Sequence, residues 1–418
     1  MKRISVVLAL VSMSASAEGV KTYLEAAGQQ NVDRRISIEQ RNRAAAEYRQ
    51  AWTALLPSLS ASGGWTHNQY NAEITLNPVT GQKAVIVPFD QFDAAFRFEV
   101  PLIDTTRWFR MSAAGVTEES TALRDQVTRD LVNRQVVGSY YGYAAALALR
   151  ESSKKSAAVA SEQLKLMEIR ASVGTVTELD RLRAKAEVAR TGQVVADTES
   201  LVATSRRTLR TLSSLEPPET LPLAEDDVTP EPALAELEAR IDQLPAVQAA
   251  DKDLQVTGRL ATASRLAIVP IISAQLTERV TNATGFTGQA TSYNAGISFA
   301  WRLDVPTFMG MQAQASNEQV ASLATERARL QARDQINFDW QRLKAALIKV
   351  EAAKAQVEAA RRATQVASDR YAAGAATQVD VIQAERDVFG AEVSQIQART
   401  ELATARASLR ISSALPLE

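Results

Sequence analysis

An internal repeat is the feature that most constrains what this chain can fold into. Segment 170–213 aligns with segment 370–413 at an offset of 200 residues and without a gap. The identical pairs are Arg170/Arg370, Gly174/Gly374, Thr177/Thr377, Asp180/Asp380, Ala184/Ala384, Val188/Val388, Ala203/Ala403, Thr204/Thr404, Arg206/Arg406, Leu209/Leu409, Arg210/Arg410 and Ser213/Ser413. Self-similarity of this kind indicates that one structural unit is used twice, so we expect two related halves.

Each half also contains short segments in which apolar and polar residues alternate, the pattern of a strand with one apolar and one polar face. The pattern is clear at 92–100 and 292–301, and weaker at 59–69 and 271–280, so each half is expected to supply one strand hairpin. The connecting loops, at about 71–88 and 281–290, are expected to face outside. The alternative is a hairpin of a periplasmic protein that lays its apolar face on helices.

Four strands are too few to close a barrel, because about eight is the smallest number that leaves room for packed side chains. Three copies of the chain would supply twelve strands and an open lumen, which predicts a homotrimer in outer membrane lipid. Two copies would give a filled barrel and a poor duct.

Helix-forming composition fills the rest of the chain. Aromatic residues make up only 6% of it, and small and charged residues dominate long stretches, which favours long helices packed closely side by side. The expected helices are at about 20–56, 106–172, 176–215, 233–267, 308–372 and 376–413. Helices of about 65 residues would reach roughly 100 Å. The predicted fold is therefore mixed but mainly α: a long α-helical barrel joined to a transmembrane β-barrel of four strands per chain, closed by trimerisation.

The domain organisation follows from the repeat and from proline. Residues 1–17 have a basic start, a short apolar run and small residues at the end, which predicts a secretory signal peptide. Residues 217–232 contain five prolines and an acidic run, which predicts a connector. The predicted parts are a first repeat at 18–216 (strand hairpin about 58–101, helical tip about 170–180) and a second at 233–418 (strand hairpin about 270–304, helical tip about 370–380).

Several function classes are disfavoured by what the chain contains. The 47 Lys and Arg residues balance 48 Asp and Glu residues, so nucleic acid is not an expected partner. There is no cysteine, the single histidine is His67, and no phosphate loop or clustered ligand set occurs, so we expect no catalytic residues, no cofactor and no metal site. We expect His67 at an interface or in a loop, and Arg206, Arg207, Arg361 and Arg362 on solvated helix faces.

The order of helices, strand pair and long helical hairpin, repeated once, resembles the TolC-like outer membrane efflux family over the whole mature chain. The resemblance is carried by Leu56–Ser60 before the first strand, by Val100–Asp104 after the second, and by the tips 170–180 and 370–380. It implies a trimeric channel of the cell outer membrane that extends into the periplasm. Its implied partners are a periplasmic adaptor (membrane fusion) protein and an inner-membrane pump.

The tips carry the candidate site residues. Gly174 and Gly374 suit a left-handed residue that ends a helix, and Thr177 and Thr377 have the T-x-x-D spacing of a helix cap. Two readings stay open for the aspartates: capping alone, or capping together with a ring of carboxylates at a closed pore entrance. The resemblance implies the second reading for Asp380 and Asp180, with Tyr371 as an aromatic contact at the gate or a packing residue.

The resemblance also places adaptor docking at the tips, on Val173, Gly174, Thr175 and Gly374. Two positions depart from the best-known family pattern. Ala376 stands where some members have a basic latch residue, and Gln383 replaces a second aspartate, so a single acidic ring is expected. The predicted function is a passive gated duct of an efflux or secretion system, and the alternative is a periplasmic adaptor or coiled-coil scaffold.

Overall fold

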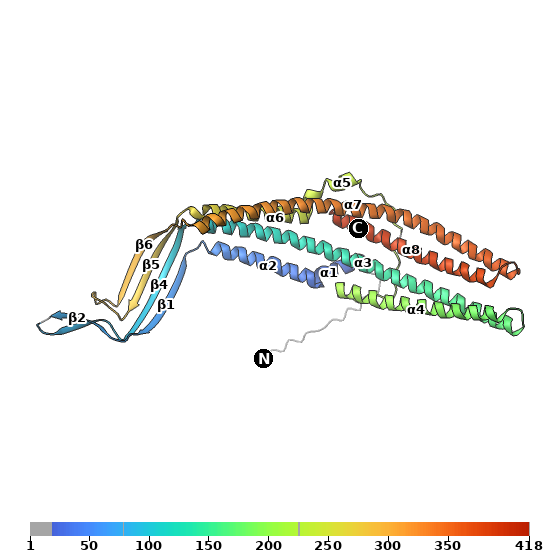
Figure 1. Cartoon of the computed structure of the whole chain (residues 1–418), viewed down its shortest axis with the longest axis horizontal. Helices are drawn as coiled ribbons and strands as arrows, with labels where there is room; N and C mark the ends of the chain where they lie inside the picture. The colour runs from blue at the N-terminus through green and yellow to red at the C-terminus, as the bar shows by residue number, and fades with distance from the viewer. Residues whose placement is uncertain (1–18, 78, 225, 418) are drawn as a thin grey trace, which may run out of the picture. The chain divides into compact units, whose positions relative to one another are not determined.

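A computed structural model describes residues 19–77, 79–224 and 226–417, so the predicted signal peptide at 1–17 lies outside the described residues. The chain is mainly helical and has one small sheet and one separate strand hairpin (Figure 1). The helices are α1 (Val20–Gln30), α2 (Val32–Thr53), α3 (Thr105–Ser172), α4 (Glu178–Ser213), α5 (Leu234–Glu238), α6 (Pro245–Arg265), α7 (Val305–Ala372) and α8 (Gln378–Ser412). The strands are β1 (Ser58–His67), β2 (Ala72–Asn77), β3 (Gln82–Val87), β4 (Asp90–Ile103), β5 (Ile271–Thr281) and β6 (Thr291–Ala300).

The chain divides into two compact units. The first contains the described residues of Met1–Ile38, Arg124–Val247 and Arg329–Glu418, and the second contains Glu39–Leu123 and Gln248–Ala328. Each unit draws on both sequence repeats. In the described residues, no helix combines the length and the apolar character needed to cross a membrane.

The first predicted helix is interrupted at Asn31, a residue that is 6% exposed. Its side-chain oxygen accepts a hydrogen bond from the backbone N–H of Asp33 at 2.9 Å, and its side-chain nitrogen donates to the carbonyl of Leu212 at 3.2 Å. Asn31 therefore ends α1, caps α2 and ties both to α4. The predicted helix 233–267 is likewise broken, into α5, short 3₁₀ turns and α6.

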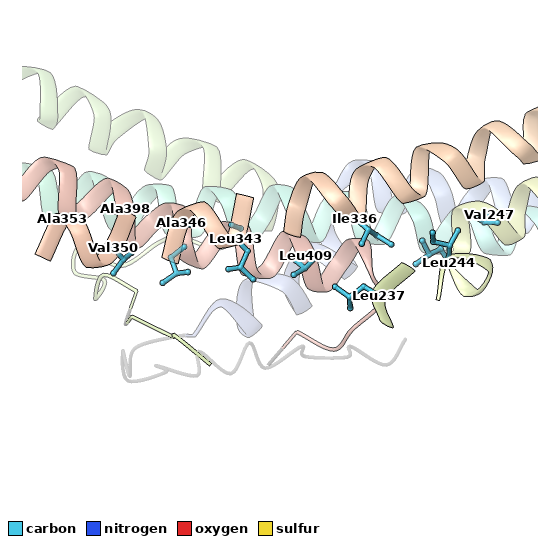
Figure 2. Close-up of a cluster of buried hydrophobic side chains, with 13 residues drawn as sticks. Leu237, Leu244, Val247, Ile336, Leu343, Ala346, Val350, Ala353, Ala398 and Leu409 are labelled. Carbon is cyan, nitrogen blue, oxygen red and sulfur yellow. The ribbon is translucent and has the colours of Figure 1, made fainter. Parts of the chain in front are cut away.

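Two hydrophobic clusters in the first unit stabilise the helical hairpins, and they obey the same repeat as the sequence. One packs α1 against α3 and α4, and the other packs α5 and α6 against α7 and α8 (Figure 2). Buried members related by the offset of 200 residues are Val136/Ile336, Tyr143/Leu343, Ala146/Ala346, Val202/Leu402 and Leu209/Leu409. The register seen in sequence over 170–213 thus extends into the helices that precede each tip. Burial of one such large side chain contributes about 1.5–3 kcal/mol.

The four-stranded sheet belongs to the second unit and is antiparallel in the order β1-β4-β5-β6. Pairing of β4 with β5 joins the hairpin of the first repeat to that of the second. Along each strand, successive side chains point to opposite faces of the sheet, and the strand register aligns them so that one face is mainly apolar and the other mainly polar. The apolar face carries Leu59, Ala61, Trp65, Phe92, Phe96, Phe98, Ala274, Leu276, Tyr293, Ile297 and Phe299.

A further hairpin, β2 with β3, occupies the stretch expected to be a loop. Gly81, with φ of 66°, forms its turn, and the run Ala84–Val87 supplies β-branched residues after it. This is a turn-flanked strand signal that the sequence analysis overlooked.

Candidate functional site

Both helical hairpins turn through the same backbone motif. Gly174 and Gly374 have φ of 74° and 76°, in the left-handed region, and no atom within 4 Å would meet a β-carbon there. The N–H groups of Thr175 and Ala375 reach back to the carbonyls of Arg170 and Arg370, at 3.0 and 2.8 Å. These are Schellman-type ends, so glycine is required by backbone conformation rather than by crowding.

A capping box opens the helix after each turn, as the T-x-x-D spacing predicts. The backbone N–H of Asp180 donates to the Thr177 hydroxyl oxygen at 3.2 Å, and that of Asp380 donates to Thr377 at 3.3 Å. In return, the carboxylate of Asp380 accepts from the Thr377 N–H at 2.7 Å and from its hydroxyl at 2.7 Å. Thr177 and Thr377 thus act as helix caps.

The two repeat-related aspartates differ in how their charge is balanced. Asp180 lies 3.6 Å from the guanidinium of Arg183. The position equivalent to Arg183 is Gln383, whose amide donates to Asp387 at 2.9 Å, and Asp380 forms no ion pair with any described residue. The backbone and hydroxyl hydrogen bonds from Thr377 hold the pKa of Asp380 below its usual value. Asp380 is therefore an exposed carboxylate whose negative charge is not compensated within the described chain.

Tyr371 contacts the first hairpin of the same chain. Its hydroxyl lies 3.6 Å from the sulfur of Met167, and the Arg170 guanidinium lies 5.3 Å from the centre of its ring. These contacts account for Tyr371 as a packing residue between the tips. A contact at a closed gate stays a prediction.

The predicted docking residues are exposed. Val173 is 69% exposed at the outermost turn of the first hairpin, beside Gly174 and Thr175. The Thr175 hydroxyl donates to the Arg170 carbonyl at 3.0 Å, and the residue is exposed. An apolar side chain and a side-chain-free turn next to each other give another protein close access to the backbone.

A polar cluster that no sequence pattern had indicated joins the two hairpins. Glu187 of α4 is 6% exposed and accepts hydrogen bonds from Arg190 of its own helix and from Arg386 of α8, at 2.5 and 2.6 Å. Burial pushes the pKa of Glu187 upward, but the hydrogen bonds from these two arginines prevail and hold it below the usual value. A pocket of about 250 Å³ lies beside it, between α3, α4, α7 and α8. The internal repeat does not relate position 187 to position 386. The two positions are 199 residues apart, whereas the repeat has an offset of 200 residues.

Comparison with known proteins agrees with this arrangement. A profile described as outer membrane efflux protein matches residues 24–214 and 237–413. No curated protein sequence matches the chain.

Solved structures give the same fold at low sequence identity. A membrane protein from Pseudomonas aeruginosa has 18% identity and a TM-score of 0.81, with 94% of this chain and 93% of that chain covered. The VceC outer membrane protein of Vibrio cholerae has 15% identity and a TM-score of 0.80, with 96% and 97% covered. The Campylobacter jejuni CmeC outer membrane channel has 16% identity and a TM-score of 0.81, with 95% and 85% covered. Because the profile spans nearly the whole described chain, the protein belongs to the outer membrane efflux protein family, which places it in the outer membrane and not among the enzymes.

Proposed function

We propose that three copies of this chain assemble into a gated duct, which takes substrates from an inner-membrane pump and a periplasmic adaptor and passes them through the outer membrane. Each copy contributes four strands to one twelve-stranded barrel and two helical hairpins to one helical barrel. The two sequence repeats, 18–216 and 233–418, each contribute one strand hairpin and one long helical hairpin to this assembly, and the connector at 217–232 joins them.

The observation that carries this proposal is the open, two-faced sheet. Within the part of the chain that the structure describes, its outer strands, β1 and β6, each have one unpaired edge, and both are ten residues long. In hydrocarbon, unpaired backbone N–H and C=O groups cost several kcal/mol each, so such edges must be paired. Pairing β1 of one copy with β6 of the next closes the sheet, with the apolar face toward lipid and the polar face toward the lumen.

The tips support a gate at the periplasmic end of the duct. Asp380 carries an uncompensated charge, so three copies around one axis would form a ring of carboxylates that attracts cations. Asp180, which lies near Arg183, contributes less to this ring. Tyr371 assists closure by fixing the second hairpin to the first.

The exposed turn residues support docking of an adaptor. Val173, Gly174, Thr175 and Gly374 offer a small apolar surface at the tips, and the two glycines leave the backbone of the turns accessible. An adaptor with helical hairpins of its own would meet this surface end to end.

The assembly can be tested by cysteine crosslinking, because the natural chain has no cysteine. Ser60→Cys in β1 is combined in turn with Ser292→Cys, Asn294→Cys and Ser298→Cys in β6, all on the polar face. If β1 pairs with β6 of a neighbour, one register brings the sulfurs into bonding distance, and oxidation gives covalent trimers on a denaturing gel. Crosslinks that stop at dimers would exclude the trimer.

Ser273→Cys with Ser298→Cys serves as the matched control. The hydroxyl oxygens of these residues lie 2.8 Å apart on neighbouring strands of one chain, so this pair should oxidise without changing the chain's size. Conductance of the purified protein in a planar bilayer then separates a duct from an adaptor or scaffold, which would form no channel.

A further inference from the structure

We infer that the Arg97 and Glu99 side chains of β4 set the ion selectivity of the membrane part of the duct. The inference rests on the proposed function, because it takes the polar face of the sheet as the wall of the lumen. It concerns residues in the sheet, and it is independent of the tips.

Register places the polar residues of the sheet in rows that run across all four strands. Arg97 lies in a row with Ser60, Thr277 and Asn294. Glu99 lies in the next row, with Ser58, Gln275 and Gly296. Each of these rows therefore contains a single charged side chain.

Other charges on this face cancel locally. Arg279 donates to the Asp93 carboxylate through two nitrogens, at 2.6 and 3.0 Å, so this pair carries no net charge. Neither Arg97 nor Glu99 forms an ion pair with a residue of the described ranges, and Arg97 is exposed. The unbalanced charges of the polar face are thus one guanidinium and, two residues further along β4, one carboxylate.

Closure by three copies would turn these charges into two adjacent rings of opposite sign. Successive rows along a strand are about 6.8 Å apart, since each residue advances about 3.4 Å. At this separation the two rings nearly compensate for each other, and the wild-type lumen has little preference for either ion sign. Removal of one ring uncovers the other, and rings of charged side chains select ions of the opposite sign.

The test is the ratio of cation to anion permeability, obtained from the reversal potential of single channels in a salt gradient. Arg97→Gln should raise this ratio and Glu99→Gln should lower it. Both shifts should be large at 0.01 M salt, where charges act over about 30 Å, and nearly vanish at 1 M, where they act over about 3 Å. Each variant is also made in an Asp380→Asn chain, so that carboxylates at the tip do not mask the effect.

Glu278→Gln is the matched control. The substitution of Glu278, on β5, removes the same negative charge as the substitution of Glu99. The register places Glu278 on the apolar face, however, between Phe96 and Tyr293. It should leave the permeability ratio unchanged. Equal shifts for Glu278→Gln and Glu99→Gln, or no shift for Arg97→Gln and Glu99→Gln in both backgrounds, would overturn the inference. Failure of the proposed function looks different, because the wild-type protein would then form no channels.

Discussion

Arg386 of α8 donates two hydrogen bonds to one carboxylate oxygen of Glu187 in α4, at 2.6 and 3.1 Å, and so ties the second helical hairpin to the first. Arg190 donates to the same carboxylate from within α4. The carboxylate is buried, whereas the Arg386 and Arg190 side chains are 45% and 37% exposed. Its loss would therefore leave two cations that water can still solvate.

We expect Glu187→Gln to lower the free energy of unfolding by about 1–2 kcal/mol, less than for a fully buried pair, because both arginine heads can turn to water. The folded state lowers the pKa of Glu187, so its contribution is complete above the unfolded value near 4.5 and disappears as pH falls through the folded value. Thermal unfolding at pH 7 and at pH 4 measures both effects. Glu392→Gln, at a carboxylate with Arg361 as its ion partner, is the milder control.

The connector is held at its two ends by arginines that the repeat relates to each other. Arg206 and Arg210 bind Glu216 immediately before it, and Arg406 and Arg410 bind Glu231 near its end. Arg206 is thus more than the solvated residue that we expected from sequence. The ion pairs of Glu231 are buried, with Arg406 at 8% and Glu231 at 6% exposure, whereas those of Glu216 are open to water.

Arg406→Met should therefore destabilise the protein by about 2–3 kcal/mol, since it leaves a buried carboxylate with only Arg410. The equivalent change in the first repeat, Arg206→Met, should cost no more than about 1 kcal/mol, as for other solvent-exposed ion pairs. Denaturant unfolding of the two variants compares them directly. Equal losses of stability in the two variants would mean that burial does not make the ion pairs of Glu231 more important than those of Glu216.

Gln378 is an anomaly in the first turn of α8. It is 3% exposed, and neither atom of its amide has a hydrogen-bond partner in the described chain. Because an unsatisfied buried polar group costs about 1–3 kcal/mol, Gln378→Leu should raise the midpoint of thermal unfolding. Glu178→Leu at the first tip should give no such gain, since Glu178 is exposed and paired with Arg181. A lower midpoint for Gln378→Leu would indicate that its amide has a partner in the assembled protein.

Local patterns in the sequence were sufficient to predict the four strands of the sheet and the tip caps, but not the β2–β3 hairpin. Phe92, Phe96 and Phe98 alternate with polar residues, and Thr377 stands three residues before Asp380, so both features follow from neighbours in the chain. The interruption at Asn31 was not predictable in this way, because its side chain bonds Leu212, 181 residues away. The ion pair between Glu187 and Arg386 and the pairing of β4 with β5 also depend on tertiary contacts that the periodicity of the sequence does not encode. The trimer and the roles of the tip residues remain predictions.

Asp380→Asn separates capping from gating at the pore entrance. Asparagine keeps an oxygen that accepts from the Thr377 N–H, so α8 stays capped and stability should change little. The negative charge is lost, and block of the channel by multivalent cations added on the periplasmic side should weaken. Asp180→Asn, beside Arg183, should have a smaller effect. Conductance titrations decide between the readings, since unchanged block would leave Asp380 with capping alone.

The last prediction concerns the glycines at the two tips. A β-branched residue at Gly374 or Gly174 would strain the left-handed backbone and confuse folding with docking. Asparagine tolerates this conformation, and no atom lies within 4 Å of the β-carbon it would add, so Gly374→Asn and Gly174→Asn should keep trimer assembly and channel conductance. The added side chain would, however, separate a docking protein from the turn backbone, so crosslinking to the adaptor and export should fall together. Variants that assemble, crosslink and export like the wild type would show that the adaptor binds elsewhere along the helices.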